Sequence, residues 1–146
     1  MQVNEAMINY QLLWFEAGDR LTTTRQLLTY LTAGVPDTGE ETFWIACMNP
    51  KHRPICRTRL KTGVLVASRV LVRDVFLALL LAEASAFACL RTQPSGAVQP
   101  NLADGRLLWN LRETARLMNL ELVDYFIARL GGGGYHSWRE HDRARD

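Results

Sequence analysis

The chain has 146 residues, of which 48% are hydrophobic and 22% are charged, and its formal net charge is +2. This length can bury one hydrophobic core and is too short for two ordinary domains, so we expect one domain over residues 1–146. The net charge is too small for composition alone to support nucleic-acid binding.

The cysteines, the N-terminus and the longest apolar segment together predict a cytoplasmic location. Cys47, Cys56 and Cys89 are an odd, widely spaced set without a C-x-x-C pair, which favours a reducing cytoplasm. The N-terminus shows no export signal, because no basic stretch precedes an apolar stretch and a cleavage site. The apolar run 75–90 has only about 16 residues, fewer than the roughly 20 that span a bilayer, so we expect no membrane association.

The first elements form an N-terminal extension and a hairpin. Residues 10–17 are apolar and aromatic and predict a strand, and residues 21–31 carry leucines at helical spacing. These two elements and a loop over residues 35–41 make up the extension 1–41. Residues 42–48 and Pro54–Leu60 then predict two strands joined at Lys51-His52.

The register of this hairpin bears on a possible zinc site. With Lys51-His52 at the tip, Cys47 lies directly opposite Cys56, and the Cys47-x4-His52-x3-Cys56 spacing suggests zinc. However, a histidine at the tip points away from both sulfurs. We therefore expect two small hydrophobic side chains packed side by side.

The remaining elements alternate between helix and strand. Residues 65–71 are β-prone, and Arg73-Asp74 opens an apolar helix at residues 75–86 that should be buried on most sides. The later elements are a central strand at 86–91, an amphipathic helix at 102–119, a strand at 120–130, a four-glycine turn, an edge strand at 135–140 and a charged tail at 141–146. This order favours a three-layer α/β/α sandwich with a mixed sheet.

One segment has the spacing of an enzyme motif. It reads Arg91-Thr92-Gln93-Pro94-Ser95-Gly96, then a four-residue spacer with a proline, then Asn101-Leu102-Ala103-Asp104. This spacing resembles, residue for residue, the H-x-H-P-S-G and S-x-x-D signature of the JAB/MPN domain of the bacterial RadC-like family. Arg73-Asp74-Val75-Phe76 resembles the family's R-E-V-F, Ser137-Trp138-Arg139-Glu140 resembles its S-L-R-E, and residues 48–53 resemble its hairpin L-D-T-x-N-R.

The resemblance covers residues 42–140, about two-thirds of the chain. It implies a JAB/MPN, or cytidine deaminase-like, fold and a zinc-dependent hydrolase that cleaves isopeptide bonds. In the family two histidines and the aspartate hold zinc, and a glutamate on an earlier strand activates water. Here Arg91 and Gln93 replace the histidines, Tyr125 replaces a further histidine, and Arg57-Thr58-Arg59 aligns with the glutamate.

These replacements predict a non-catalytic protein without a cofactor. A guanidinium cannot lose its proton and repels a metal cation, so Asp104 is the one zinc ligand left at its family position. We expect a binding or scaffolding module that contacts another protein through the former active-site groove or an apolar surface. The predicted binding residues are Arg57, Arg59, Arg91, Gln93, Ser95 and Asp104, and the ligand would be an acidic peptide or a phosphate group.

Several alternatives remain open. Asp104 could simply pair with Arg91, and the Pro94-Ser95-Gly96 turn could be retained for folding alone. A zinc hydrolase could use a relocated site built from Cys89, Asp104 and a distant histidine, His136 or His141. The hairpin cations Lys51, Arg53, Arg57, Arg59 and Lys61 could bind nucleic acid. An apolar partner surface could include Trp14, Phe15, Trp44 or Trp138.

Overall fold

A computed structural model describes residues 19–60 and 69–145. Its elements in chain order are α2 (Thr24–Thr32), β1 (Phe43–Met48), β2 (Pro54–Leu60), α4 (Val72–Leu81), β3 (Ala86–Thr92), α5 (Leu102–Met118), β4 (Glu121–Ala128), β5 (Tyr135–Ser137) and α6 (Trp138–Arg145). The expected strand at 10–17 and most of the β-prone stretch 65–71 lie outside the described residues. The other predicted elements are found close to their expected bounds, except for the helix expected at 75–86, which is α4 and ends at Leu81, and the C-terminus.

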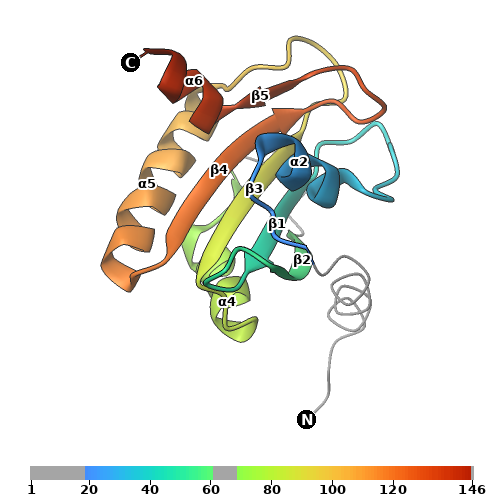
Figure 1. Ribbon diagram of the computed structural model, residues 1–146. Helices are drawn as coiled ribbons and strands as arrows, with labels where there is room; N and C mark the ends of the chain where they lie inside the picture. Colours follow the sequence, from blue (N-terminus) through green and yellow to red (C-terminus); the bar gives the residue numbers. More distant parts are fainter. Residues whose placement is uncertain (1–18, 61–68, 146) are drawn as a thin grey trace.

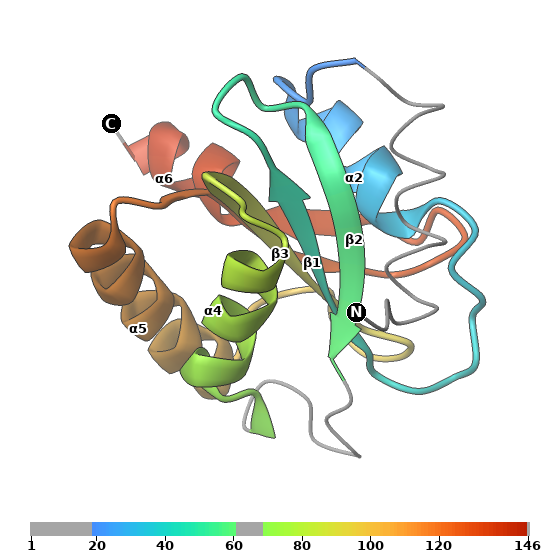
Figure 2. The ribbon, with the colours of Figure 1, turned by 90° about the horizontal axis from the view of Figure 1, so that it is seen from below.

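The strands form one mixed sheet in the order β2-β1-β3-β4-β5. The β3–β4 pair is parallel and the other three pairs are antiparallel. Helix α2 covers one face of the sheet, and α4 and α5 lie side by side on the other face (Figures 1 and 2). The predicted α/β sandwich with a mixed sheet is therefore confirmed.

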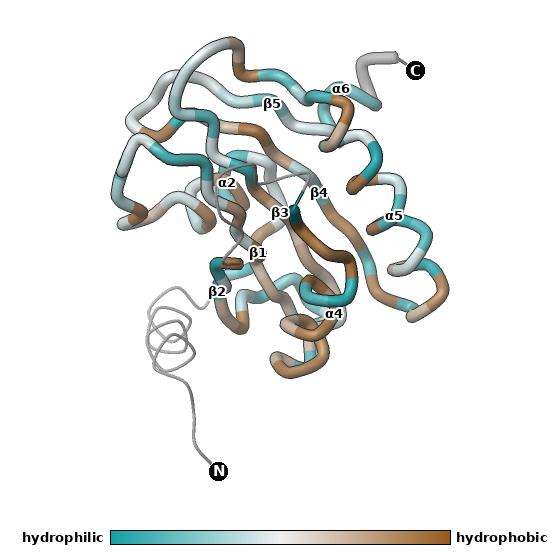
Figure 3. Tube along the Cα trace, turned by 180° about the vertical axis from the view of Figure 1, so that it is seen from behind, coloured by the Kyte–Doolittle hydropathy of each residue, from teal (hydrophilic) through white to brown (hydrophobic). Residues whose placement is uncertain are grey.

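Side-chain alternation along the strands divides the core into two layers. Phe43, Ile45, Phe87 and Cys89 pack with buried residues of α4 and α5. The intervening residues of β1 and β3 pack with Leu27 and Leu31 of α2. Hydrophobic residues accordingly follow β3 through the centre of the molecule (Figure 3).

The hairpin register agrees with the sequence prediction. Cys47 pairs with Cys56, and both thiols are buried and free. His52 lies in the turn between the strands with a φ of 61°, and its Nε2 atom is 3.0 Å from the Glu121 carboxylate. The His52 ring therefore contacts the start of β4 and does not approach the cysteine pair.

Helix α4 is less buried than its composition predicts. Val75, Phe76 and Leu79 face the sheet, but Leu77, Leu80 and Leu81 are 56%, 57% and 64% exposed. The expectation of burial on most sides is wrong, because α4 contacts the sheet and α5 along one side only.

None of the helices in residues 19–60 and 69–145 combines the length and apolar character needed to cross a bilayer.

The C-terminal segment also differs from its prediction. The edge strand has only three residues, and residues 138–145 form α6 in place of a longer strand and a charged tail. The first turn of α6 is fastened by side chains, since the Ser137 Oγ atom accepts the Glu140 N–H and the buried Asp124 carboxylate accepts the Arg139 N–H. These contacts satisfy N–H groups that have no partner within the helix.

Candidate functional site

The turn after β3 carries the predicted motif. Gly96 has a φ of 79°, a left-handed conformation that glycine adopts without steric cost. Arg129, which directly follows β4, donates hydrogen bonds to the backbone oxygens of Gln93, at 3.3 Å, and Gly96. The turn is therefore attached to the neighbouring strand.

Helix α5 begins with a reciprocal cap that fixes the position of Asp104. The Asn101 side chain accepts the Asp104 N–H at 2.8 Å, and the Asn101 N–H donates to the Asp104 carboxylate at 2.9 Å. This capping box holds the carboxylate in the first turn of the helix, facing β3. Asparagine thus provides the N-cap where the family signature has serine.

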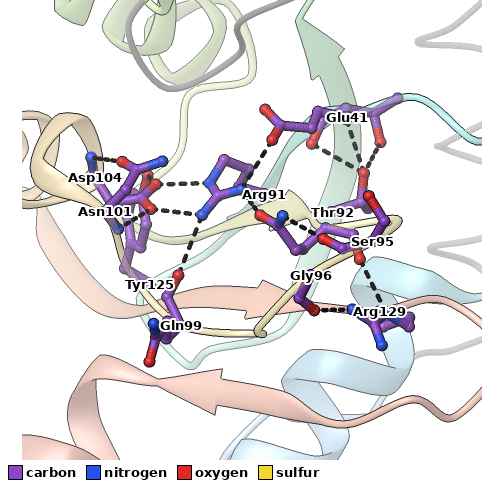
Figure 4. Close-up of polar contacts among 12 residues, drawn as sticks. Glu41, Arg91, Thr92, Ser95, Gly96, Gln99, Asn101, Asp104, Tyr125 and Arg129 are labelled. Carbon is purple, nitrogen blue, oxygen red and sulfur yellow. Dashed lines mark hydrogen bonds and ion pairs between the residues drawn. The ribbon is translucent and has the colours of Figure 1, made fainter.

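Arg91 and Asp104 form a buried bidentate ion pair (Figure 4). The Arg91 Nε atom donates to Asp104 Oδ1 at 2.9 Å, and its Nη2 atom donates to Oδ2 at 2.7 Å. Each side chain is 1% exposed. Two parallel charge-assisted hydrogen bonds are the strongest arrangement available to this pair of groups.

The remaining Arg91 donors are also engaged. The Nη1 atom donates to the Glu41 carboxylate at 3.3 Å and to the side-chain oxygen of Gln93, and the Nη2 atom donates to the Gln99 backbone oxygen at 3.4 Å. A guanidinium has five N–H donors, and all five have acceptors here. Arg91 therefore has no free donor for a ligand.

The acceptor sites of Asp104 are likewise filled. Its carboxylate accepts four hydrogen bonds, two from Arg91, one from the Asn101 N–H and one from the Tyr125 hydroxyl at 2.8 Å. A carboxylate has about four lone-pair positions. A metal ion could bind Asp104 only by displacing one of these donors.

The pKa shifts agree with this pairing. Burial alone lowers the pKa of Arg91, but the hydrogen bonds and charge of Asp104, followed by the charge of Glu41, outweigh it and raise that pKa overall. Burial, followed by the nearby Asp104 charge, raises the pKa of Tyr125 well above its ordinary value. At neutral pH, Arg91 is therefore charged and Tyr125 carries the proton that it donates to Asp104.

The structure brings only part of the predicted binding set together. Arg91 donates hydrogen bonds to both Gln93 and Asp104, so these three residues lie together. Ser95 is exposed in the turn, and its backbone oxygen accepts a hydrogen bond from the Gln93 amide at 2.6 Å. The alternative in which Asp104 pairs with Arg91 matches this geometry.

Arg57 and Arg59 do not join Arg91, so the expected shared cationic pocket does not form. Arg57 lies on the opposite face of the sheet, where its Nη1 atom donates to the backbone oxygens of Tyr30 and Ala33 at the end of α2, at 2.9 and 2.6 Å. Its guanidinium also lies over the Trp44 ring, 5.1 Å from the centroid. Arg57 therefore caps α2, while Arg59 is exposed.

Glu41 is the site residue that the sequence interpretation missed. The resemblance aligns residues 57–59 of the edge strand with the family's glutamate, but the carboxylate that reaches Arg91 comes from Glu41, in the segment just before β1. The sequence signal is that Glu41 lies two residues before Phe43, because side chains two residues apart share a face of a sheet. Phe43 pairs with Arg91 across β1 and β3. Using this signal required knowledge that β1 adjoins β3.

Comparison with known proteins identifies the class of this fold and then its family. A mixed five-stranded sheet flanked by helices is consistent with a JAB/MPN-type domain. The family model for the RadC-like JAB domain matches residues 21–143, and the chain belongs to this family. This finding confirms the resemblance seen in the sequence.

The similar curated proteins carry the name UPF0758. One from Vibrio cholerae serotype O1 (strain M66-2) is 32% identical over 123 residues, which cover 84% of this chain and 54% of that protein. One from Chlorobaculum parvum is 25% identical over 122 residues, with the same two coverages. The chain therefore spans about half the length of the curated relatives that it matches.

Removal of either partner of the buried ion pair should strongly destabilise the fold. We expect Arg91→Met and Asp104→Asn each to lower the free energy of unfolding by about 3–5 kcal/mol, because each leaves a buried polar group without its partner. The double variant should lose less than the sum of the two single losses. Urea denaturation measures all three values.

Arg116→Met is the matched control on α5, because its ion pair with Glu113 is exposed to solvent and should contribute less than about 1 kcal/mol. Small and additive losses for Arg91 and Asp104 would contradict the buried pairing.

The stability of the protein should depend on pH through Tyr125. Because the pKa of Tyr125 is raised in the folded state, its contribution is fully present below about pH 10 and is lost as the pH rises further. Urea denaturation between about pH 9 and 11 should show a shallower decline for Tyr125→Phe than for the unsubstituted chain. Tyr135→Phe is the comparison for an exposed phenol: its hydrogen bond to Glu140 raises the pKa of Tyr135, but exposure to solvent should make the change in slope smaller than for Tyr125→Phe. Equal slopes for Tyr125→Phe and the unsubstituted chain would refute the prediction.

Proposed function

We propose that this chain is a non-catalytic RadC-like JAB domain that acts as a binding or scaffolding module for another protein. The observation that carries the proposal is the guanidinium of Arg91, which lies between the carboxylates of Glu41 and Asp104. In the family resemblance, this position belongs to a zinc-binding histidine. A positive charge that cannot be removed would repel a divalent cation there.

The donor chemistry of the site does not fit zinc. A catalytic zinc site needs three protein ligands, drawn from imidazole nitrogen, thiolate and carboxylate, and an open position. Arg91 supplies none of these, and the side-chain oxygen of Gln93 already accepts a hydrogen bond from Arg91. Both oxygens of Asp104 are engaged as well. The site therefore lacks the ligands that a zinc-dependent hydrolytic step would need.

The two other hypotheses have weaker support. A relocated zinc site would need the Cys89 thiolate, but burial strongly raises the pKa of Cys89 and keeps it protonated. A nucleic-acid surface on the hairpin would need Arg57, which is buried against α2. The free, buried cysteines remain consistent with the proposed cytoplasmic location.

The apolar surface is a better binding candidate than the former groove. An acidic peptide or a phosphate group would need donors from Arg91, and these donors are all engaged. By contrast, Leu77, Leu80 and Leu81 form an exposed stripe on α4, at the i, i+3, i+4 spacing of one helix face. Exposed apolar stripes of this kind mark protein interaction sites, so the proposed partner presents an apolar protein surface.

Restoring the family's histidines tests the proposed loss of zinc binding. We expect the double variant Arg91→His/Gln93→His to gain about one zinc ion per chain relative to the unsubstituted protein, because two imidazoles then join the Asp104 carboxylate. Mass spectrometry of metal content after dialysis measures the gain. Gln93→His alone is the control, since Arg91 still occupies the site.

The opposite result would be stoichiometric zinc in the unsubstituted chain that disappears in Asp104→Ala. Cleavage of an amide bond by the unsubstituted chain, abolished by a chelator, would also refute the proposal.

A pair of surface variants tests the proposed contact on α4. We expect Leu77→Asp/Leu80→Asp to lose at least about tenfold in affinity for the partner, since two apolar contacts become charged. Arg59→Asp is the control, because Arg59 is exposed on the α2 side of the sheet. Affinity capture from the native cell identifies candidate partners. Sedimentation then measures the affinity of each purified candidate for three chains: the unsubstituted chain, the double leucine variant and Arg59→Asp. Equal binding to all three chains would exclude α4 as the contact surface.

A further inference from the structure

Two of the three histidines of the chain lie together at the C-terminal edge of the sheet. His136 is in β5 and His141 is in α6, and their ring centroids are 5.2 Å apart with the planes tilted by 43°. His136 is half-buried and His141 is exposed. The pair is therefore open to solvent on one side, which gives an ion in solution a path to it.

The pair lies beside the former active site. Arg91 pairs with Ile127 across β3 and β4, and Ile127 pairs with His136 across β4 and β5. Residues in register across neighbouring strands share a face of the sheet, so His136 is two strand spacings, about 10 Å, from Arg91. The histidine pair contains neither Arg91 nor Asp104, so its properties do not depend on the proposed loss of activity.

The backbone between the two histidines is held in place by buried contacts. The Ser137 hydroxyl donates to the Asp124 carboxylate at 2.6 Å, and the Arg139 N–H donates to the same carboxylate at 3.0 Å. The Arg112 guanidinium of α5 lies over the Trp138 ring, 4.8 Å from its centroid. These contacts fix the backbone of β5 relative to α6, which keeps the two histidines next to each other.

We propose that His136 and His141 together bind one divalent transition-metal ion such as Zn²⁺ or Ni²⁺. A metal ion about 2.1 Å from a ring nitrogen lies about 3.2 Å from that ring's centroid, and two rings at a tetrahedral angle then have centroids about 5.2 Å apart. The observed separation is 5.2 Å. Neutral imidazole is a preferred ligand for these metals.

The surroundings of His136 favour its neutral, metal-binding form. Burial, followed by the proximity of His141, lowers the pKa of His136, while the charges of Asp124 and Asp104 oppose this shift. No group of three or more histidine, cysteine or acidic side chains suited to a metal occurs within residues 19–60 and 69–145, so the proposed site has two protein ligands.

Titration of the chain without an affinity tag tests the pair, with Ni²⁺ and Zn²⁺ as probes. We expect one ion per chain, and we expect His136→Gln and His141→Gln each to weaken binding by about tenfold or more, since loss of even an outer-shell partner has an effect of that size. Isothermal titration calorimetry measures the affinities. His52→Gln is the matched control. His52 is the remaining histidine of the chain, and it contacts Glu121 at the opposite end of β4 from the pair.

The exposed position of His141 makes His141→Gln informative even if His136→Gln unfolds. Binding that is absent in the unsubstituted chain, or equal in all three variants, would overturn the proposal. Zinc lost in Asp104→Ala but retained in His141→Gln would contradict the proposed function instead. The two proposals therefore fail through different results.

Discussion

The structure depends on how the charge of Arg91 is compensated within the core. An unpaired guanidinium at this depth would lose its hydration and destabilise the fold by several kcal/mol, roughly the whole margin of a small domain. Asp104, Glu41, Gln93 and the Gln99 backbone together supply five acceptors. Arg91 is in β3, and these partners come from the segment before β1, the turn after β3 and α5. The requirement to neutralise one side chain therefore joins four parts of the chain.

A guanidinium and a metal ion can solve the same structural problem in this fold. Each is a cation that gathers carboxylates from separate elements, but a metal exchanges its ligands and polarises water, whereas a guanidinium only donates hydrogen bonds. The Arg91–Asp104 pair thus supports a domain that keeps the connection between β3 and α5 without the associated chemistry. Tyr125 extends the same network, because its hydroxyl fills an acceptor position on Asp104.

The two faces of the sheet divide the arginines by role. Arg91 and Arg57 are both buried cations, yet one meets carboxylates on the α5 side and the other caps the end of α2 beside Trp44. Strand alternation decides this difference, since Arg57 pairs with Ala46 on the α2 side of β1. Arg91 of β3 pairs with Ile127 of β4, and Ile127 pairs with His136 of the edge strand β5, so His136 lies in register with Arg91 across the sheet.

Local patterns in the sequence determined most of the elements before β5, the Cys47–Cys56 register, the mixed α/β class and the family. Hydrophobic period, glycine turns and motif spacing act over a few residues, so a single sequence carries them. Tertiary structure alone decided that Glu41 reaches Arg91, that Arg57 turns to the other face, and that one side of α4 stays exposed. These outcomes depend on which strands become neighbours and which helix covers each face. That choice follows from the packing of distant segments, and no local pattern specifies it.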